Sequence, residues 1–253
     1  MTATAIFALS SQAPPSPGRV LQPVPGFEST AYAYLNGKIV WAGQTAVSDH
    51  PRNAVNPWQP PPLVCDAACL KAGAITCLGL FGQTPLAKIQ GKGLLTWLVG
   101  LRLPFPLFFA APRFDAIRAA LEDGNIDALE HAALRVLGLG DGLTPSGDDF
   151  VGGIFFALAH APRPAWQAQF AQLKMRIRAA ALPSTNAISA ALLDDLMDGA
   201  SHRALHDMLV ALQSNDAARM EAAGRDLMRV GATSGADMLA GLLLALLTLN
   251  IEN

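Results

Sequence analysis

Two segments of the sequence, 148–159 and 236–249, are apolar around nearly their whole circumference when they are read as helices. A helix without a polar face is stable only inside a core or at an interface. We therefore expect these two helices to form the centre of a helical domain, with the other elements arranged around them.

The two segments also repeat each other without gaps, at an offset of 234 − 146 = 88 residues. The matching pairs are Ser146 and Ser234, Gly147 and Gly235, Asp149 and Asp237, and Gly153 and Gly241. Glycine in mid-helix costs ~1 kcal/mol relative to alanine, so it is expected where two helices pack closely. The repeat predicts two helices that cross at their glycines, with both N-termini and two aspartates at one pocket. The alternative is two unrelated capped helices that resemble each other by chance.

The chain changes character near residue 112, and we expect an α+β fold with two parts, 1–112 and 113–253. In the first part, Asn36-Gly37 between two apolar runs predicts a β-hairpin with strands at 28–35 and 38–43. Residues 75–81 are interpreted as a further strand. This β-rich N-terminal region is expected to pack on a mostly α-helical domain. Its predicted helices span 114–122, 126–137, 148–159, 165–181, 187–198, 202–213, 216–228 and 236–249.

Composition narrows the class of protein. Hydrophobic residues make up 51% and charged residues 15%, against an ordinary ~25% charged, which favours an oligomer or a complex. The net charge of -2 and the lack of a long basic run exclude binding to nucleic acid by phosphate neutralisation. No basic residue precedes the short apolar run at 5–9, and no apolar run reaches the ~20 residues of a bilayer span. We therefore expect a cytoplasmic protein without a membrane segment.

A glycine-rich loop at 138–149 carries most of the functional signal. A loop of this kind that enters a helix N-terminus offers backbone N–H groups and a positive dipole end, which suit an anion. The alternative for Ser146 and Asp149 is a capping box, because they have the S-x-x-D spacing. Residues 183–186 are interpreted as the N-cap of the next helix, with hydroxyls that also suit the same pocket. His202 and His206 are interpreted as partly exposed structural residues.

An anion site and a cluster of carboxylates conflict unless something reconciles them. A bridging Mg²⁺ binds carboxylates and phosphate oxygens together. A ligand with an anionic end and an amide end also satisfies both, because N–H groups hold the anion while aspartate accepts from –NH₂. Both possibilities remain open at this stage, and neither a cofactor nor a metal ligand is assigned.

The loop of residues 137–150, together with Ser184-Thr185 and the segment 231–237, resembles the AllH family of oxamate carbamoyltransferase subunits. The likeness is strongest from about residue 134 to 247. It implies a complex with AllF-type and AllG-type subunits that transfers a carbamoyl group between carbamoyl phosphate and oxamate. Two departures are Asp141, where many members have proline, and Ala232, where a histidine-like residue is frequent.

The resemblance and the loop chemistry together give the candidate residues. Asp148 and Asp149 are the candidate catalytic residues. The candidate ligand-binding residues are Gly140, Gly142, Thr144, Pro145, Ser146, Gly147, Ser184, Thr185, Thr233, Ser234, Gly235 and Asp237. The leading hypothesis is a carbamoyltransferase subunit that binds a small anionic amide or phosphate at this loop. The alternatives are a ligand-sensing or scaffolding subunit, and a Mg²⁺-dependent phosphotransferase or hydrolase that uses Asp148 and Asp149.

Overall fold

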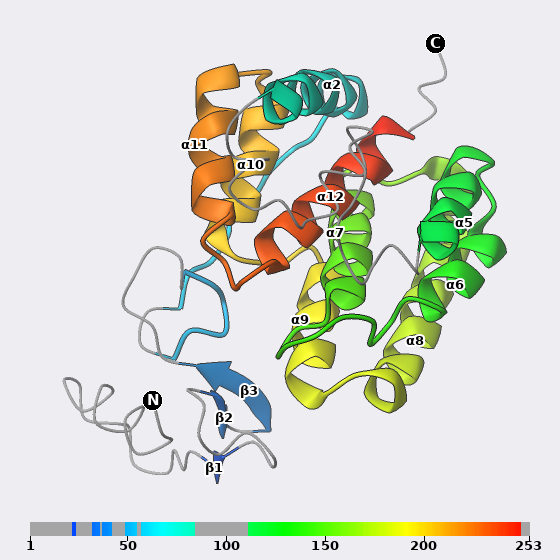
Figure 1. Cartoon of the computed structure of the whole chain (residues 1–253), viewed down its shortest axis with the longest axis vertical. Helices are drawn as coiled ribbons and strands as arrows, with labels where there is room; N and C mark the ends of the chain where they lie inside the picture. The colour runs from blue at the N-terminus through cyan, green and yellow to red at the C-terminus, as the bar shows by residue number, and fades with distance from the viewer. Residues whose placement is uncertain are drawn as a thin grey trace.

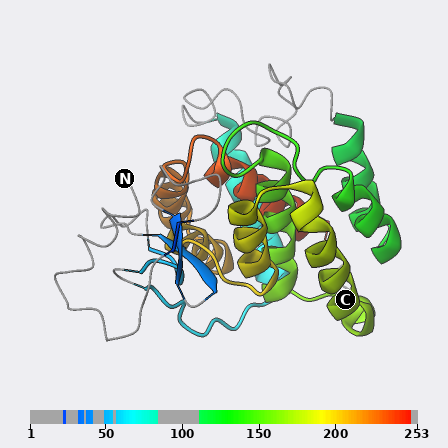
Figure 2. The ribbon, with the colours of Figure 1, turned by 90° about the horizontal axis from the view of Figure 1, so that it is seen from below.

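The computed structural model describes residues 22–23, 32–35, 37–41, 49–54, 57–83 and 111–248. It has the expected α+β class: a small antiparallel sheet lies at one side of a larger body of helices (Figure 1). The outer parts of the two predicted strands, 28–31 and 42–43, lie outside the described residues. The view turned by 90° also places the strands and helix α5 (Ala111–Glu122) on opposite sides of the body (Figure 2).

The predicted hairpin is confirmed. The sheet has the order β1 (Gln22–Pro23), β2 (Tyr32–Leu35) and β3 (Lys38–Trp41), with both pairs antiparallel. Leu35 faces Lys38 across the turn, and Gly37 has φ +76°, a conformation that glycine adopts without strain. Gly37 therefore lies in the turn between the two strands, where the sequence indicated it.

The strand predicted at 75–81 is wrong, because these residues lie in helix α2 (Ala67–Gln83). Leu70, Ala74 and Cys77 are fully buried, and their spacing follows the helical period. Gly73 lies so close to helix α10 that an added Cβ would stand 2.1 Å from the Leu212 carbonyl oxygen. Tertiary packing thus overrides the β-branched pair Ile75-Thr76 in this segment.

The remaining predicted helices are confirmed, with small differences at their ends. They are α5 (Ala111–Glu122), α6 (Ile126–Leu134), α7 (Ser146–His160), α8 (Gln167–Ser184), α9 (Ala187–Met197), α10 (Arg203–Gln213), α11 (Ala217–Leu227) and α12 (Ser234–Leu247). A short 3-10 turn, Pro164–Trp166, precedes α8. The expected N-cap of α9 is Asn186, whose side chain accepts from the N–H groups of Ile188 and Ser189. Among the helices of the described residues, none is long and apolar enough to cross a bilayer.

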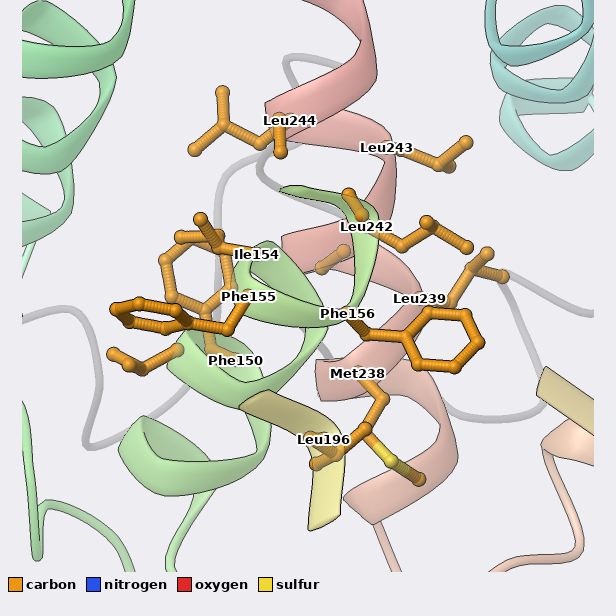
Figure 3. Packing of buried hydrophobic residues seen from close by; sticks show 14 of the residues in the cluster. Phe150, Ile154, Phe155, Phe156, Leu196, Met238, Leu239, Leu242, Leu243 and Leu244 are labelled. Carbon is orange, nitrogen blue, oxygen red and sulfur yellow. The ribbon is translucent and has the colours of Figure 1, made fainter. Parts of the chain in front are cut away.

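Helices α7 and α12 form the centre of the helical body and are buried along nearly their whole length (Figure 3). They cross at the two predicted glycines. A Cβ at Gly153 would lie 2.1 Å from the Met238 carbonyl oxygen, and a Cβ at Gly241 would lie 2.0 Å from the Phe150 carbonyl oxygen. Since any side chain would push the backbones apart, the two glycines set the closeness of this crossing.

The structure extends the repeat beyond these two helices. Helices α5, α6 and α7 are followed in the same order by α10, α11 and α12, and the first two helices of each group pack together. Asn125 caps α6 by accepting from Ala128 N–H, and Asp216 caps α11 by accepting from Arg219 N–H. The residue before each cap has positive φ, +66° at Gly124 and +50° at Asn215. The order α5, α6, α7 and its cap are therefore repeated in α10, α11, α12, while α2, α8 and α9 stand outside this repeat.

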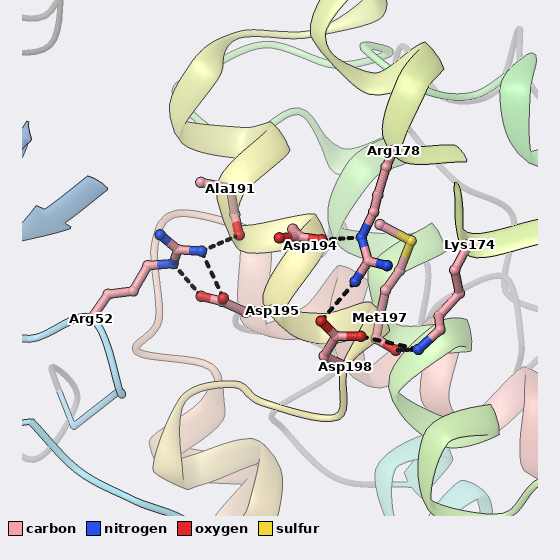
Figure 4. A network of polar contacts seen from close by, with 8 residues as sticks. All are labelled: Arg52, Lys174, Arg178, Ala191, Asp194, Asp195, Met197 and Asp198. Carbon is pink, nitrogen blue, oxygen red and sulfur yellow. Dashed lines mark hydrogen bonds and ion pairs between the residues drawn. The ribbon is translucent and has the colours of Figure 1, made fainter. Parts of the chain in front are cut away.

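The N-terminal sheet packs on α9, which with α8 lies between the two repeated groups of helices. Ile39 of β3 and Ile188 of α9 share a small apolar cluster. Arg52 donates to the backbone oxygens of Ile39 and Ala191 and forms a two-pronged ion pair with Asp195 (Figure 4). Helix α2, from the first part of the chain, packs against α10, α11 and α12 of the second part. The division into two parts at residue 112 therefore stays a prediction.

Candidate functional site

The loop between α6 and α7 has a backbone that requires its glycines. Gly138, Gly140 and Gly142 have φ of +74°, +117° and +108°. A Cβ at Gly138 would stand 2.0 Å from the Ser184 carbonyl oxygen, and a Cβ at Gly140 would stand 2.8 Å from Ser146 N. The Gly147 N–H donates back to the Leu139 carbonyl oxygen. The loop is thus folded tightly against the first turn of α7.

The carboxylate of Asp148 holds this loop in place. Its Oδ1 accepts from Gly138 N–H at 2.7 Å, and its Oδ2 accepts from the Ser189 hydroxyl of α9 at 2.6 Å. The side chain is 1% exposed. Both oxygens are therefore engaged in joining the loop to the neighbouring helix.

The N-termini of α7 and α12 lie together, as the repeat predicted. The Thr144 and Ser234 hydroxyls are 2.7 Å apart, and the Ser146 and Thr233 hydroxyls are 3.4 Å apart. The capping box is not formed, because Pro145 is the N-cap of α7 and no side chain caps this helix. In α12 the second amide is also engaged, since Gly235 N–H donates to the Val230 carbonyl oxygen.

A cavity of about 220 Å³ opens where the two helices begin. Its wall comes from the two loops, the first turns of α7 and α12, the N-terminal region and the segment from α9 to α10. The described residues on this wall are Tyr32, His50, Asp141, Gly142, Leu143, Thr144, Asp149, Leu192, Leu196, Ser201, His202, Val230, Gly231, Ala232, Thr233, Ser234 and Met238. Among them, no lysine or arginine is present.

Asp149 is the acidic group buried in this wall, and its side chain is 5% exposed. Burial and the nearby carboxylate of Asp237 raise the pKa of Asp149 well above its ordinary value, although hydrogen bonds with Ser234 and Thr144 oppose the shift. Asp149 Oδ2 has no hydrogen-bond partner among the described residues. A buried carboxyl group with a raised pKa is neutral over a wider pH range, and it then donates a hydrogen bond as well as accepting one.

His50 contributes a second polar group to the wall. Arg52 N–H donates to His50 Nδ1 at 3.1 Å, which assigns the ring proton of the neutral form to Nε2. Burial, followed by the influence of His202, Arg52 and His206, lowers the pKa of His50 to about 2. The ring packs at a tilt against Trp41 and His202, with centroids 4.7 and 4.8 Å from its own. His50 is therefore a neutral imidazole at physiological pH.

The structure brings only part of the candidate set to the cavity wall. Gly142, Thr144, Asp149, Thr233 and Ser234 lie on it. The candidates behind the wall, in the two loops and helix starts, are Gly140, Pro145, Ser146, Gly147, Asp148, Gly235 and Asp237. Ser184 and Thr185 end helix α8, where Ser184 supports Gly138 through its carbonyl group, and they do not line the cavity.

Among the wall residues that sequence reasoning missed are Tyr32, His50 and His202. Tyr32 and His50 lie far upstream of the loop, and no local pattern links them to it. His202 was interpreted as structural and partly exposed, and it stands on the wall; its neighbour His206 is buried, with 4% exposure. Among the described residues, no group of three or more His, Cys, Asp or Glu side chains has an arrangement that suits a metal ion.

The geometry defines a class of protein: a helical domain of two repeated units with a small polar cavity at the meeting point of two buried helices. Comparison with known proteins finds a family match in the part of the chain that forms this cavity. The family model described as oxamate carbamoyltransferase subunit AllH matches residues 136–246, which supports an AllH-type family. The match runs from the glycine loop to the end of α12 and so includes both helix starts. No curated protein and no solved structure matches the chain.

Proposed function

We propose that this chain is a subunit of an oxamate carbamoyltransferase complex and that the cavity at the starts of α7 and α12 is its ligand site. The observation that carries the proposal is the buried Asp149 on the cavity wall, beside Asp237, inside the region that matches the AllH family. A volume of about 220 Å³ suits a ligand of a few heavy atoms, since drug-sized ligands occupy roughly 300–1,000 Å³.

The reaction would form a bond between the amide nitrogen of oxamate and the carbamoyl carbon. The bond between that carbon and a phosphate oxygen breaks, and the departing phosphate takes up the proton that the nitrogen loses. Such a transfer needs the two reactants to be oriented and the negative charge on carbonyl oxygens to be stabilised. A neutral Asp149 supplies a hydrogen-bond donor for such an oxygen. The hydroxyls of Thr144 and Ser234 position the Asp149 carboxyl group.

The cavity wall favours a division of labour between subunits. Phosphate is normally bound by lysine or arginine, and the described residues of the wall contain neither. We therefore propose that an AllF-type or AllG-type partner supplies the cations for carbamoyl phosphate, while this chain holds the amide. This arrangement agrees with the low content of charged residues, which favours a chain that buries surface against partners.

Ligand binding is tested by thermal unfolding of the full-length chain with millimolar oxamate or carbamoyl phosphate, alone and with partner subunits. A ligand that binds the folded state raises the unfolding temperature. We expect a rise with oxamate for the chain alone, and a rise with carbamoyl phosphate only in the complex. The absence of any shift in all four conditions would refute the proposal.

Turnover by the reconstituted complex separates a catalytic subunit from a sensing or scaffolding subunit. Asp149→Ala is expected to lower kcat at least ~100-fold, as the loss of one donor to a developing oxyanion does elsewhere. The matched control is Asp123→Ala, which alters an exposed aspartate in the turn after α5. Full turnover by Asp149→Ala in an intact complex would assign the chemistry to another subunit. Turnover that survives EDTA would remove the Mg²⁺-dependent alternative.

A further inference from the structure

One atom on the cavity wall has no hydrogen-bond partner within the described residues. This atom is the buried Oδ2 of Asp149. The Asp149 carboxyl group does form hydrogen bonds with Ser234 and Thr144, but they leave Oδ2 without a partner. A buried polar atom without a partner costs about 1–3 kcal/mol, and a fold retains such an atom where a ligand satisfies it. Asp149 lines the cavity, so this buried carboxyl group lies directly behind the surface that the cavity's occupant meets.

The charges around Asp149 determine which chemical group of a ligand can lie against it. Asp237 lies close enough to raise the pKa of Asp149 by charge repulsion, so the two carboxyl groups cannot easily ionise together. The described wall has no lysine or arginine, and His50 is neutral. A carboxylate or phosphate placed against Asp149 would therefore meet a negative environment without a compensating cation, whereas an uncharged amide would not.

We propose that this cavity binds its ligand by the carboxamide end, with the Asp149 carboxyl group donating to the amide carbonyl oxygen and the anionic end directed to the exposed rim. The inference rests on the proposed function and specifies how the ligand is oriented. The rim consists of Asp141, Gly142, Gly231 and Ala232, which are exposed. An anion there remains in water, where solvent screens it from the Asp141 carboxylate.

The protonation of Asp149 depends on groups from several elements. Asp237 of α12 and Asp148 of α7 raise its pKa, and Tyr32 of β2 lies near enough for Asp149 to raise the pKa of the phenol in turn. His50, His202 and Asp141 share the same cavity. Donation to the amide carbonyl oxygen requires the neutral acid. In this binding mode the affinity for the amide is therefore highest at low pH and falls as the pH rises through the pKa of Asp149.

Oxamate and oxalate form a suitable pair of probes because they have nearly the same shape and differ by an amide in place of a carboxylate. Their binding to the full-length chain is measured by calorimetry between pH 5 and pH 8. We expect oxamate to bind at least tenfold more tightly than oxalate, with the oxamate affinity falling as pH rises.

Two variants separate the donor from the shape of the site. Asp149→Asn keeps an N–H donor without a titratable proton, so oxamate should bind within about threefold of the native affinity at pH 5 and without pH dependence. Asp149→Ala removes the donor and should weaken oxamate binding at least tenfold. Asp123→Asn is the matched control and should leave both affinities unchanged; circular dichroism verifies that each variant is folded.

The outcomes separate this inference from the function on which it rests. Equal, pH-independent binding of oxamate and oxalate would overturn the carboxamide orientation and leave the ligand site in place. Loss of oxamate binding in Asp149→Asn would also overturn it, because the donor would then not be the feature that matters. Failure of both probes to bind, with and without partner subunits, would refute the proposed function together with this inference.

Discussion

Asp148 and Asp149 are neighbours in the sequence, but their carboxyl groups have different surroundings. Asp148 accepts hydrogen bonds at both oxygens, from Gly138 N–H and from the Ser189 hydroxyl. Asp149 lines the cavity, and one of its oxygens is buried without a partner among the described residues. Consecutive helical residues point about 100° apart, so one aspartate fastens the loop and the other is available to a ligand.

Asp148→Ala should destabilise the fold. The substitution leaves the Gly138 N–H and the buried Ser189 hydroxyl without an acceptor, which costs about 2–3 kcal/mol. Urea unfolding measures the change, and Asp123→Ala, at an exposed position, should stay within about 0.5 kcal/mol of the native chain. An equal, small effect of both substitutions would contradict the anchoring role of Asp148.

Asp149→Asn should stabilise the fold at neutral pH. The pKa of Asp149 is raised in the folded state, so the unfolded chain holds fewer protons, and stability decreases as pH rises from the unfolded pKa through the folded one. Asparagine removes this loss, which is ~1.4 kcal/mol for each unit of pKa shift. Unfolding free energies at pH 4.5 and 7.5 should differ more for the native chain than for the variant. A gap of the same size in both would show that Asp149 ionises normally.

At the scale of the secondary-structure elements, the site depends on the close crossing of α7 and α12. Their glycines bring the backbones close enough for the Thr144 and Ser234 hydroxyls to meet at 2.7 Å. The loops that precede the helices differ in length, since α6 ends at Leu134 and α7 begins at Ser146, whereas α11 ends at Leu227 and α12 begins at Ser234. The longer loop before α7 therefore supplies residues 141–144 of the cavity wall, an addition to the otherwise repeated structure.

Gly153→Ala and Gly241→Ala should each cost about 3 kcal/mol or more, because the added methyl group would stand near 2 Å from a backbone oxygen of the other helix. Gly79→Ala in α2 is the matched control, since a Cβ there has nothing within 4 Å. That change should stabilise the chain by up to about 1 kcal/mol through helix propensity. Chemical denaturation of the three variants tests the difference, and similar values for all three would contradict the close crossing.

At the scale of the whole molecule, histidines join the N-terminal segment to the helical body. His50 packs at a tilt against His202, and His206 contacts Trp58, Phe156 and His160. Burial lowers the pKa of His50 to about 2 and that of His206 to about 3. These rings are neutral in the folded chain, whereas in the unfolded chain they take up protons below pH 6.5.

Acid should therefore weaken this junction. A lowered folded pKa contributes stability that is complete above pH 6.5 and is lost as pH falls toward the folded pKa, at up to ~1.4 kcal/mol per pH unit for each group. His206→Gln should flatten the decline between pH 6 and pH 4 by about 2 kcal/mol, as measured by urea unfolding at each pH. His131→Gln, at an exposed position in α6, should leave the native slope unchanged. Parallel curves for all three proteins would show that His206 titrates normally.

Local patterns in the sequence were enough to predict the main elements. The all-round apolar character of two segments predicted the buried pair, the repeated glycines predicted their crossing, and Asn36-Gly37 predicted the hairpin. These features could be recognised because each depends on residues that lie close together in the sequence, within one helix or one turn. The repeat also contained an unused signal: Asp149 matches Asp237, while Asp148 matches Ala236, which already separates the two aspartates.

Only the tertiary structure decided which side chains share the cavity. Residues 75–81 are helical because α2 packs against α10 and α12, and their own sequence favours a strand. Tyr32 and His50 reach the cavity because the sheet and Arg52 attach the N-terminal segment to α9. Such contacts join residues that are more than ninety positions apart, and no local period encodes them. They form because burying apolar surface and pairing charges in the folded chain outweigh the entropy lost in closing these long loops.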